Sequence, residues 1–133
     1  SKNDEAKGIV NFSSVYSLVS PMPSLYKNTE KHIGYSISKA AVNQLTKHLA
    51  THLAPRIRVN CIVLGGIETD QITKFAENYS KHVPMGRMMK KNELIGLIEY
   101  LCSNKSTYTT GSIITTAEMI KNRNNKKINN AFL

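Results

Sequence analysis

Cysteine is scarce in this sequence, and long apolar runs are missing from it. Its 133 residues include only two cysteines, Cys61 and Cys102, which do not form a C-x-x-C pair. This excludes a disulfide framework and a cysteine-based zinc site, and we expect both thiols to be buried and reduced. No apolar stretch approaches the roughly 20 residues of a membrane-spanning helix, and the polar first five residues show no secretory signal. We therefore expect a cytoplasmic protein with no membrane partner.

Acidic residues are missing from the C-terminal end of the chain. The formal net charge is +9, and residues 121–133 contribute +4 of it without a single acid. A basic tail can bind nucleic acid or another polyanion, but no recognition motif or interleaved aromatic residue accompanies this charge. Its Asn/Lys-rich composition is typical of a solvated terminus. We expect one domain over residues 1–119, a disordered tail over 120–133 and no nucleic-acid partner, with polyanion binding by the tail as a minor alternative.

The remaining sequence alternates between strand and helix patterns. Hydrophobic residues make up 41% of the chain and charged residues 20%, a globular composition. Strands are predicted over 7–14, 57–64 and 108–116, because these stretches are rich in β-branched residues and are bounded by small or polar ones. Helices are predicted over 35–53 and from Asn92 onward. Strands that alternate with helices indicate an α/β fold with a parallel sheet.

The helix over 35–53 carries aliphatic residues at intervals of four, and Pro55 follows its end. We expect this apolar stripe to face the core. Its members are Ile37, Ala41, Leu45, Leu49 and Leu53.

Chemistry-bearing residues stand at the predicted ends of these elements. Ser14 ends the first strand, and Gly65 and Gly66 follow the second. Ligands of open α/β sheets bind outside the carboxyl ends of the strands, so these residues should border one crevice. Tyr35 and Lys39 open the intervening helix and lie one turn apart on the same face.

This combination suits acid–base chemistry on a carbonyl group. A free phenol is a weak acid near neutral pH, but a nearby ammonium favours its phenolate form. A serine hydroxyl can hold a carbonyl oxygen where the phenol protonates it, while the hydride must come from a cofactor. A tyrosine and a lysine four residues apart are common by chance, so the prediction depends on Ser14 and the glycines as well.

Several ordered segments resemble the catalytic half of the short-chain dehydrogenase/reductase family. These segments read G-I-V-N-F-S-S, Y-S-I-S-K-A-A-V, R-V-N-C-I-V-L-G-G-I-E-T, P-M-G-R-M, E-L-I-G-L-I-E-Y-L-C-S and Y-T-T-G-S-I-I, and they cover about residues 7–115. The resemblance implies a Rossmann-type sheet and an NAD- or NADP-dependent interconversion of alcohol and carbonyl.

The resemblance also implies a role for individual residues. Ser14 orients and polarises the substrate oxygen, Tyr35 donates or accepts the proton, and Lys39 favours the phenolate and binds the nicotinamide ribose. The cofactor-binding residues would be Tyr35 and Lys39, together with a turn near the nicotinamide carboxamide. That turn consists of Gly65, Gly66, Ile67 and Thr69.

The family's upstream elements, the glycine-rich loop and the N-N-A-G stretch, are not in this sequence. The glycine-rich loop T-G-x-x-x-G-x-G is absent, and no two glycines are separated by a single residue. The chain thus resembles the C-terminal half of such an enzyme, a partial Rossmann-type parallel sheet without the N-terminal dinucleotide-binding βαβ unit. The first hypothesis is an oxidoreductase. The alternative is an inactive remnant that acts as a binding or dimerisation module.

The interval from Ser14 to Tyr35 is longer than the family's usual spacing. The extra residues, around 21–31, would lie beside the substrate, and family members with similar inserts act on bacterial surface sugars. We therefore expect a small-molecule alcohol or carbonyl substrate, with a sugar derivative as the specific suggestion. The helix over 35–53 packs against a partner subunit in the family, which implies a homo-oligomer. His48 and His52 lack a third ligand, so no metal site is expected.

Overall fold

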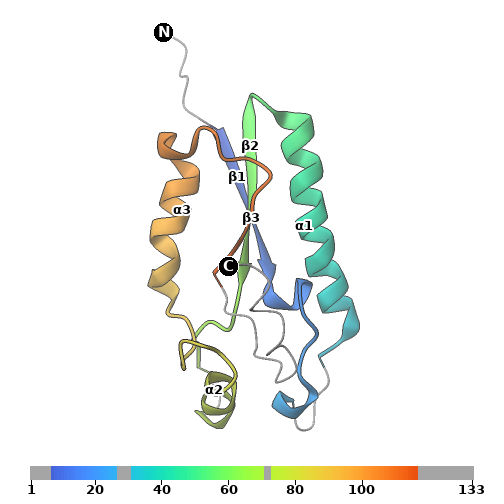
Figure 1. Cartoon of the computed structure of the whole chain (residues 1–133), viewed down its shortest axis with the longest axis vertical. Helices are drawn as coiled ribbons and strands as arrows, with labels where there is room; N and C mark the ends of the chain where they lie inside the picture. The colour runs from blue at the N-terminus through green and yellow to red at the C-terminus, as the bar shows by residue number, and fades with distance from the viewer. Residues whose placement is uncertain (1–6, 27–30, 71–72, 117–133) are drawn as a thin grey trace, which may run out of the picture.

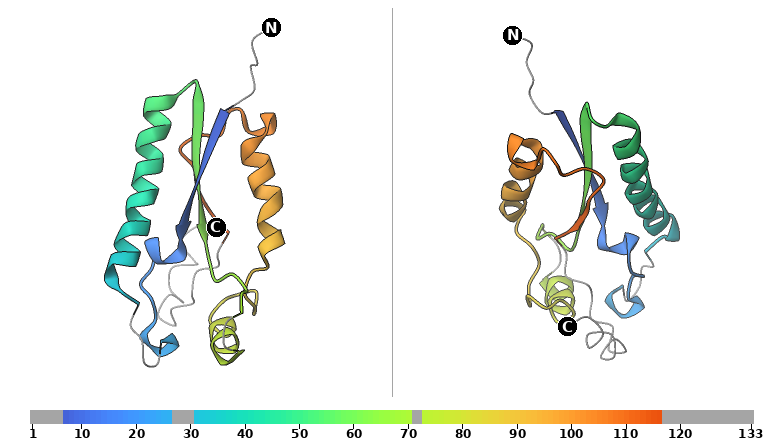
Figure 2. Two further views of the ribbon diagram at one scale, coloured as in Figure 1. Left: turned by 180° about the vertical axis from the view of Figure 1, so that it is seen from behind. Right: turned by 45° about the horizontal axis from the view of Figure 1, so that its top comes forward.

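The chain forms a small parallel sheet with a helix on each face. The computed structural model describes residues 7–26, 31–70 and 73–116. Strands β1 (Lys7–Ser14), β2 (Ile57–Leu64) and β3 (Ile113–Thr115) pair in parallel in the order β1-β2-β3. Helices α1 (Ile33–Leu53) and α3 (Ile95–Cys102) flank this sheet on opposite sides (Figures 1 and 2). The predicted α/β fold with a parallel sheet is confirmed, and the tail predicted over 120–133 lies outside the described residues.

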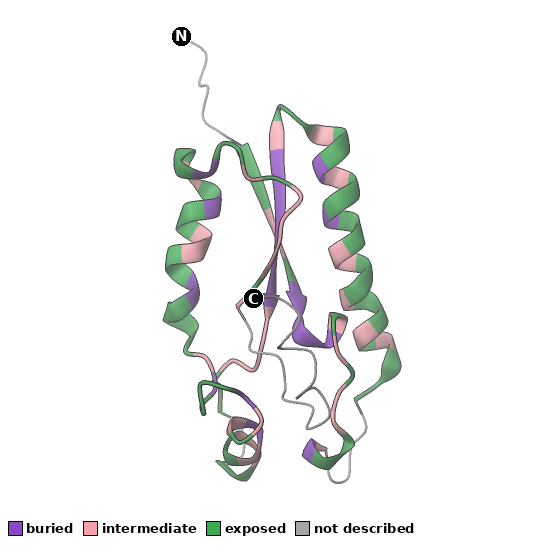
Figure 3. Ribbon diagram, in the orientation of Figure 1, coloured by how far each residue is buried: buried purple, intermediate pink, exposed green. Residues whose placement is uncertain are grey.

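Strand β2 is the centre of the molecule. Val59, Cys61, Ile62 and Val63 have no exposed surface, so side chains on both faces of this strand are covered (Figure 3). Burial on both faces is typical of a central parallel strand, and the polar residues of this one, Arg58 and Asn60, are buried with side-chain hydrogen bonds to main-chain carbonyls. The first two strand predictions have the bounds found in the structure.

The register of the sheet brings Ser14 and the glycine turn after β2, both of which are predicted site residues, close together. Ser14 at the end of β1 pairs with Leu64 at the end of β2. The chain therefore leaves both strands at the same level, and Gly65 follows beside Ser14. Parallel pairing thus turns two distant sequence positions into neighbours at one edge of the sheet.

Helix α1 packs on the sheet through small and polar residues. Its fully covered residues are Thr46 and Ala50. The Asn11 amide donates to Thr46 Oγ1 at 3.0 Å, and the Ser13 hydroxyl donates to the Lys39 carbonyl at 2.8 Å. The helix begins two residues before the predicted start, because the His32 ring accepts a hydrogen bond from the Gly34 amide and caps it.

The prediction of a core-facing stripe on this helix is wrong for its first three members, whereas Leu49 and Leu53 are half-buried. Ile37 and Leu45 are 62% and 50% exposed, and Ala41 is also exposed. Each helical residue turns the chain by about 100°, so steps of four drift by about 40° each and leave one face. Polar groups of β1, including Asn11 and Ser13, select the Thr46 side of the helix instead.

Helix α3 covers the other face of the sheet with its aliphatic residues. Leu94 and Leu101 are buried against Ile62. The start of the helix is fixed by Glu93, whose carboxylate accepts the Lys90 amide hydrogen at 2.8 Å within the short 3₁₀ turn Lys91–Leu94. Cys102 is exposed, which corrects the prediction that both thiols are buried; it follows Leu101 by one residue and so points away from the core.

Strand β3 is shorter than the predicted strand over 108–116. Gly111 has a φ of 73°, and it forms a turn before the strand. The buried Asn60 donates from Nδ2 to the Thr109 carbonyl at 2.8 Å and accepts the Ser112 amide hydrogen at 3.1 Å. These side-chain bonds satisfy backbone groups that a regular ladder would pair, so the sheet pairing of β3 starts only at Ile113.

A second apolar cluster lies beyond the carboxyl ends of the strands. It joins the 3₁₀ turns η1 (Val15–Ser17) and η2 (Pro23–Leu25) to helix α2 (Thr73–Ser80). In Figure 1 these segments lie at the lower end of the molecule, toward which β1 and β2 point. The buried members are Val15, Tyr16, Leu25, Tyr79, Val83 and Met88. This cluster forms the walls of the candidate site.

Candidate active site

A cavity of about 150 Å³ opens at the carboxyl ends of β1 and β2. Two of the three predicted catalytic residues, Ser14 and Tyr35, line it together with Gly65, Gly66 and Ile67. The other lining residues are Val15, Tyr16, Tyr26, Lys31, Phe75, Tyr79 and Met88. The fold therefore brings the end of β1, the start of α1 and the turn after β2 to one hollow, at the place where α/β sheets bind ligands.

Ser14 and Tyr35 carry hydroxyl groups that are available to a ligand. Ser14 is buried, and its Oγ accepts the Tyr16 amide hydrogen at 3.2 Å, which caps the following turn and holds the side chain in place. No described residue accepts the hydrogen of the Ser14 hydroxyl, and none forms a hydrogen bond with the phenol of Tyr35. Tyr35 is 37% exposed. Both groups can therefore donate to an oxygen atom placed in the cavity.

Lys39 lies one helical turn behind Tyr35. Its Nζ is 5.8 Å from the centre of the Tyr35 ring, and it donates to the Phe12 carbonyl of β1 at 3.2 Å. The hydrogen bond from Ser13 to the Lys39 carbonyl fixes the same turn of α1 against the strand. Lys39 is not a lining residue of the cavity, but its ammonium retains two further hydrogens for a ligand.

Aromatic side chains that sequence reasoning missed form the outer wall. The hydroxyls of Tyr16 and Tyr26 are 2.7 Å apart, and the Tyr26 ring lies 5.7 Å from that of Phe75. Burial, and then the hydrogen bond with Tyr26, raise the pKa of Tyr16, so its phenol stays neutral. The signal in the sequence was the long interval between Ser14 and Tyr35, which contains both tyrosines.

Gly66 sits where no other residue fits. A Cβ atom at this position would lie 2.7 Å from Tyr79 ring carbons and 2.9 Å from the Met88 methyl group. The close approach lets the Gly66 amide donate to the Tyr79 hydroxyl at 2.7 Å. The glycine at the end of β2 thus has a structural explanation in this chain, namely close packing against α2.

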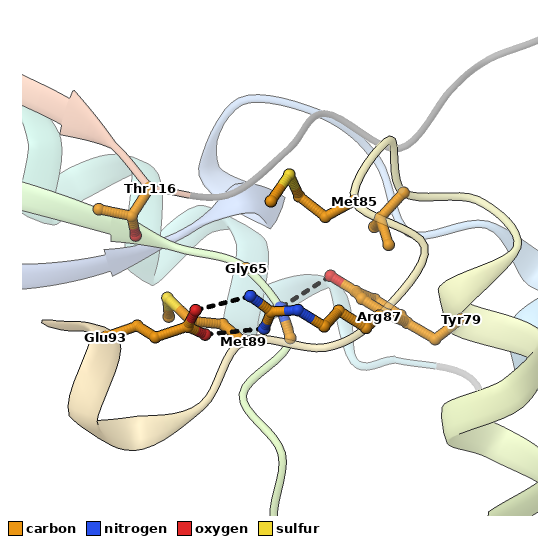
Figure 4. A pocket seen from close by; sticks show the side chains of 9 residues that line it. Gly65, Tyr79, Met85, Arg87, Met89, Glu93 and Thr116 are labelled. Atoms are coloured by element: carbon orange, nitrogen blue, oxygen red, sulfur yellow. Dashed lines mark hydrogen bonds and ion pairs between the residues drawn. The ribbon is translucent and has the colours of Figure 1, made fainter.

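A second cavity, of about 220 Å³, adjoins the same turn. Figure 4 shows Gly65, Tyr79 and Met85 on its wall together with the ion pair of Arg87 and Glu93. The two bonds of this pair measure 2.6 and 2.8 Å. The Arg87 guanidinium thereby binds the Glu93 carboxylate and fixes the segment before α3.

The remaining candidate residues lie away from the first cavity. Thr69 is exposed and is not among the residues that line it. The rings of His48 and His52 stack at 4.0 Å on α1.

Within residues 7–26, 31–70 and 73–116 there is no group of three or more potential ligands that could hold a metal ion. No helix in the same ranges has both the length and the apolar character to cross a membrane.

Known proteins are similar to this chain in sequence and in fold. A family model described as enoyl-(acyl carrier protein) reductase matches residues 4–117. Over 111 residues the chain is 34% identical to the 3-oxoacyl-[acyl-carrier-protein] reductase FabG of Aquifex aeolicus, covering 80% of this chain and 42% of that protein. It is 32% identical to the post-translational flagellin modification protein A of Campylobacter coli, covering 85% and 45%.

The solved structures agree. A short-chain dehydrogenase from Leptospira borgpetersenii with bound NAD⁺ superposes with a TM-score of 0.76 at 34% identity, covering 85% of this chain and 43% of the other. The fold is the Rossmann-type α/β fold of these structures. This chain belongs to the short-chain dehydrogenase/reductase family, and it spans less than half the length of the relatives it matches.

Proposed function

We propose that this chain supplies the catalytic half of an NAD- or NADP-dependent oxidoreductase that interconverts an alcohol and a carbonyl. The observation that carries the proposal is the shared cavity of Ser14 and Tyr35, with the Lys39 ammonium behind the Tyr35 ring. The names of the relatives, a reductase and a dehydrogenase, support the same reaction class. The two free cysteines fit a reducing compartment such as the cytoplasm.

In this mechanism Ser14, Tyr35 and Lys39 each have a separate role. Ser14 donates its hydroxyl hydrogen to the substrate oxygen and orients it. Tyr35 gives the phenolic proton to that oxygen during reduction and takes it back during oxidation. Lys39 holds positive charge near the ring, which stabilises the phenolate that forms when the proton leaves.

The residues present fit the nicotinamide end of a dinucleotide. Lys39 has ammonium hydrogens for ribose hydroxyls, and Gly65, Gly66 and Ile67 line the cavity beside it. A bound nicotinamide supplies or accepts the hydride, which no side chain can do. We expect Thr69 to complete this turn.

We further propose a sugar derivative as the substrate. The insert between Ser14 and Tyr35 contributes Tyr26 and Lys31 to the cavity wall. Tyrosine rings offer flat apolar faces beside hydroxyl groups, a combination that suits a polyhydroxylated ring.

The test uses the protein expressed from the complete reading frame that contains these 133 residues, called the full-frame protein below. It is mixed with NADH or NADPH and a panel of oxo sugars and simpler ketones, and cofactor oxidation is followed by absorbance. Lys39→Met should weaken cofactor binding and slow turnover, while Lys47→Met, on an exposed part of α1, should change neither. Failure to oxidise either cofactor with any carbonyl would contradict the proposal.

A second candidate function is that of a binding or dimerisation module without turnover. Ile33, Ile37 and Leu45 of α1 are 72%, 62% and 50% exposed, an apolar face that a second copy of the chain would cover. This face supports assembly as a homo-oligomer in either case. An inactive full-frame protein that still dimerises would favour this second function.

A further inference from the structure

The Lys31 side chain points into the first cavity. Its Nζ lies 4.7 Å from the ring centre of Tyr35 and 5.8 Å from those of Tyr16 and Tyr26. Aromatic faces attract cations at separations up to about 6 Å. Three rings on three segments therefore hold one ammonium beside the phenol that would transfer the proton.

The charge of this ammonium has no partner among the described residues that line the cavity. Among those residues Lys31 is the one charged side chain, and none of them carries a carboxylate. The neighbouring phenol of Tyr16 cannot supply a negative charge, since burial raises its pKa and keeps it neutral. The cavity wall thus presents a net positive charge that an anionic group of a ligand can neutralise.

We propose that Lys31 is a substrate-recognition residue that binds a carboxylate, so that the substrate, the sugar derivative proposed above included, carries a carboxylate near its reacting group and is an oxo acid or the corresponding hydroxy acid. This inference rests on the proposed function, because it takes the reacting carbonyl to lie at Ser14 and Tyr35. The short distance between the Lys31 ammonium and the Tyr35 ring places the carboxylate only a few bonds from the reacting carbonyl.

The wall favours a carboxylate over a phosphate. Phosphate groups carry up to two charges and are bound in proteins by several donors, often arginine forks or series of main-chain amides. Here one lysine faces a cavity of about 150 Å³. A single, compact ammonium with three hydrogens is matched to a small carboxylate.

Two probes that differ in charge and by one methyl group test this inference. Acetoacetate carries a carboxylate two bonds from its ketone, and methyl acetoacetate is its neutral ester. In the full-frame protein, Lys31→Met should lower kcat/KM for acetoacetate by about tenfold to a hundredfold more than for the ester, mainly through KM. Lys31→Arg should restore most of the loss, and Lys47→Met should show none. Equal loss with both probes, or loss with neither, would overturn the inference.

Direct binding separates this inference from the proposed function. Acetoacetate and the ester are titrated into wild type and Lys31→Met, and binding is measured by ligand-detected NMR, which needs no turnover. Tighter binding of acetoacetate that depends on Lys31 supports the inference even if no reaction is found. Equal affinity of wild type for the two probes, or affinity that Lys31→Met does not alter, refutes it even if the enzyme proves active.

Discussion

The amide of Gly66 donates a hydrogen bond of 2.7 Å to the hydroxyl of Tyr79. This bond ties the turn after β2 to helix α2 and so closes one wall of the cavity. Tyr79→Phe removes the acceptor and leaves the amide without this partner, which should lower the free energy of unfolding by about 1–2 kcal/mol. Urea denaturation measures the loss. Tyr108→Phe is the matched control, because Tyr108 is fully exposed and should show no change.

Asn60 connects β2 to the turn before β3 with both ends of its amide. Asn60→Ala breaks two buried hydrogen bonds, and we expect it to lower the free energy of unfolding by about 2–3 kcal/mol. Asn60→Asp retains an acceptor for the Ser112 amide but loses the donor to Thr109. Thermal denaturation should rank both variants below Asn104→Ala, which alters an exposed residue. A small effect of Asn60→Ala would show that the turn forms without this contact.

The Glu93 carboxylate gives a pH-dependent contribution to stability. Its bonds with Arg87, and then the Lys90 amide, lower the pKa of Glu93 from 4.5 to about 2. The folded-state pKa is depressed, so this stabilisation is present above pH 4.5 and is lost as the pH falls toward 2. Glu93→Gln should therefore lower the urea midpoint at pH 7, and the difference from wild type should shrink between pH 4.5 and 2. A difference that does not vary with pH would contradict the assignment.

The apolar face of α1 gives a prediction about assembly. Leu45 is 50% exposed in the single chain, so Leu45→Lys should change the stability of a monomer by less than about 0.5 kcal/mol. If this face joins two copies of the chain, the same change should dissociate the oligomer, because it places a charge in the interface. Light scattering after size-exclusion chromatography measures the mass. Asn104→Lys adds the same charge elsewhere and should leave the mass unaltered.

Strong local patterns made much of the fold predictable. β1 and β2 are rich in β-branched residues and are followed or ended by small ones, and their paired ends bring Ser14 and Gly65 to one edge of the sheet. The spacing of Tyr35 and Lys39 placed both at the start of α1, where the structure also has them. These features follow from local sequence and from the geometry of parallel strands.

Features that depend on tertiary contacts were not predictable in this way. The buried face of α1 is chosen by Asn11 and Ser13 of a strand more than 20 residues away, and the start of β3 by Asn60. The cavity wall joins Tyr26 to Phe75, segments that only the folded chain brings together. Lys31 belongs to the same class, because nothing in its local sequence indicates the three rings around its ammonium.

The most direct test of the proposed chemistry is the turnover of Tyr35→Phe. The full-frame protein and this variant are compared on the carbonyl substrate that wild type reduces fastest, and cofactor affinity is measured in parallel by fluorescence. Loss of the phenolic proton should lower kcat by about 100- to 10,000-fold and leave the Kd for the nicotinamide cofactor within about twofold. Tyr108→Phe should behave as wild type. Retention of wild-type turnover by Tyr35→Phe would contradict the account.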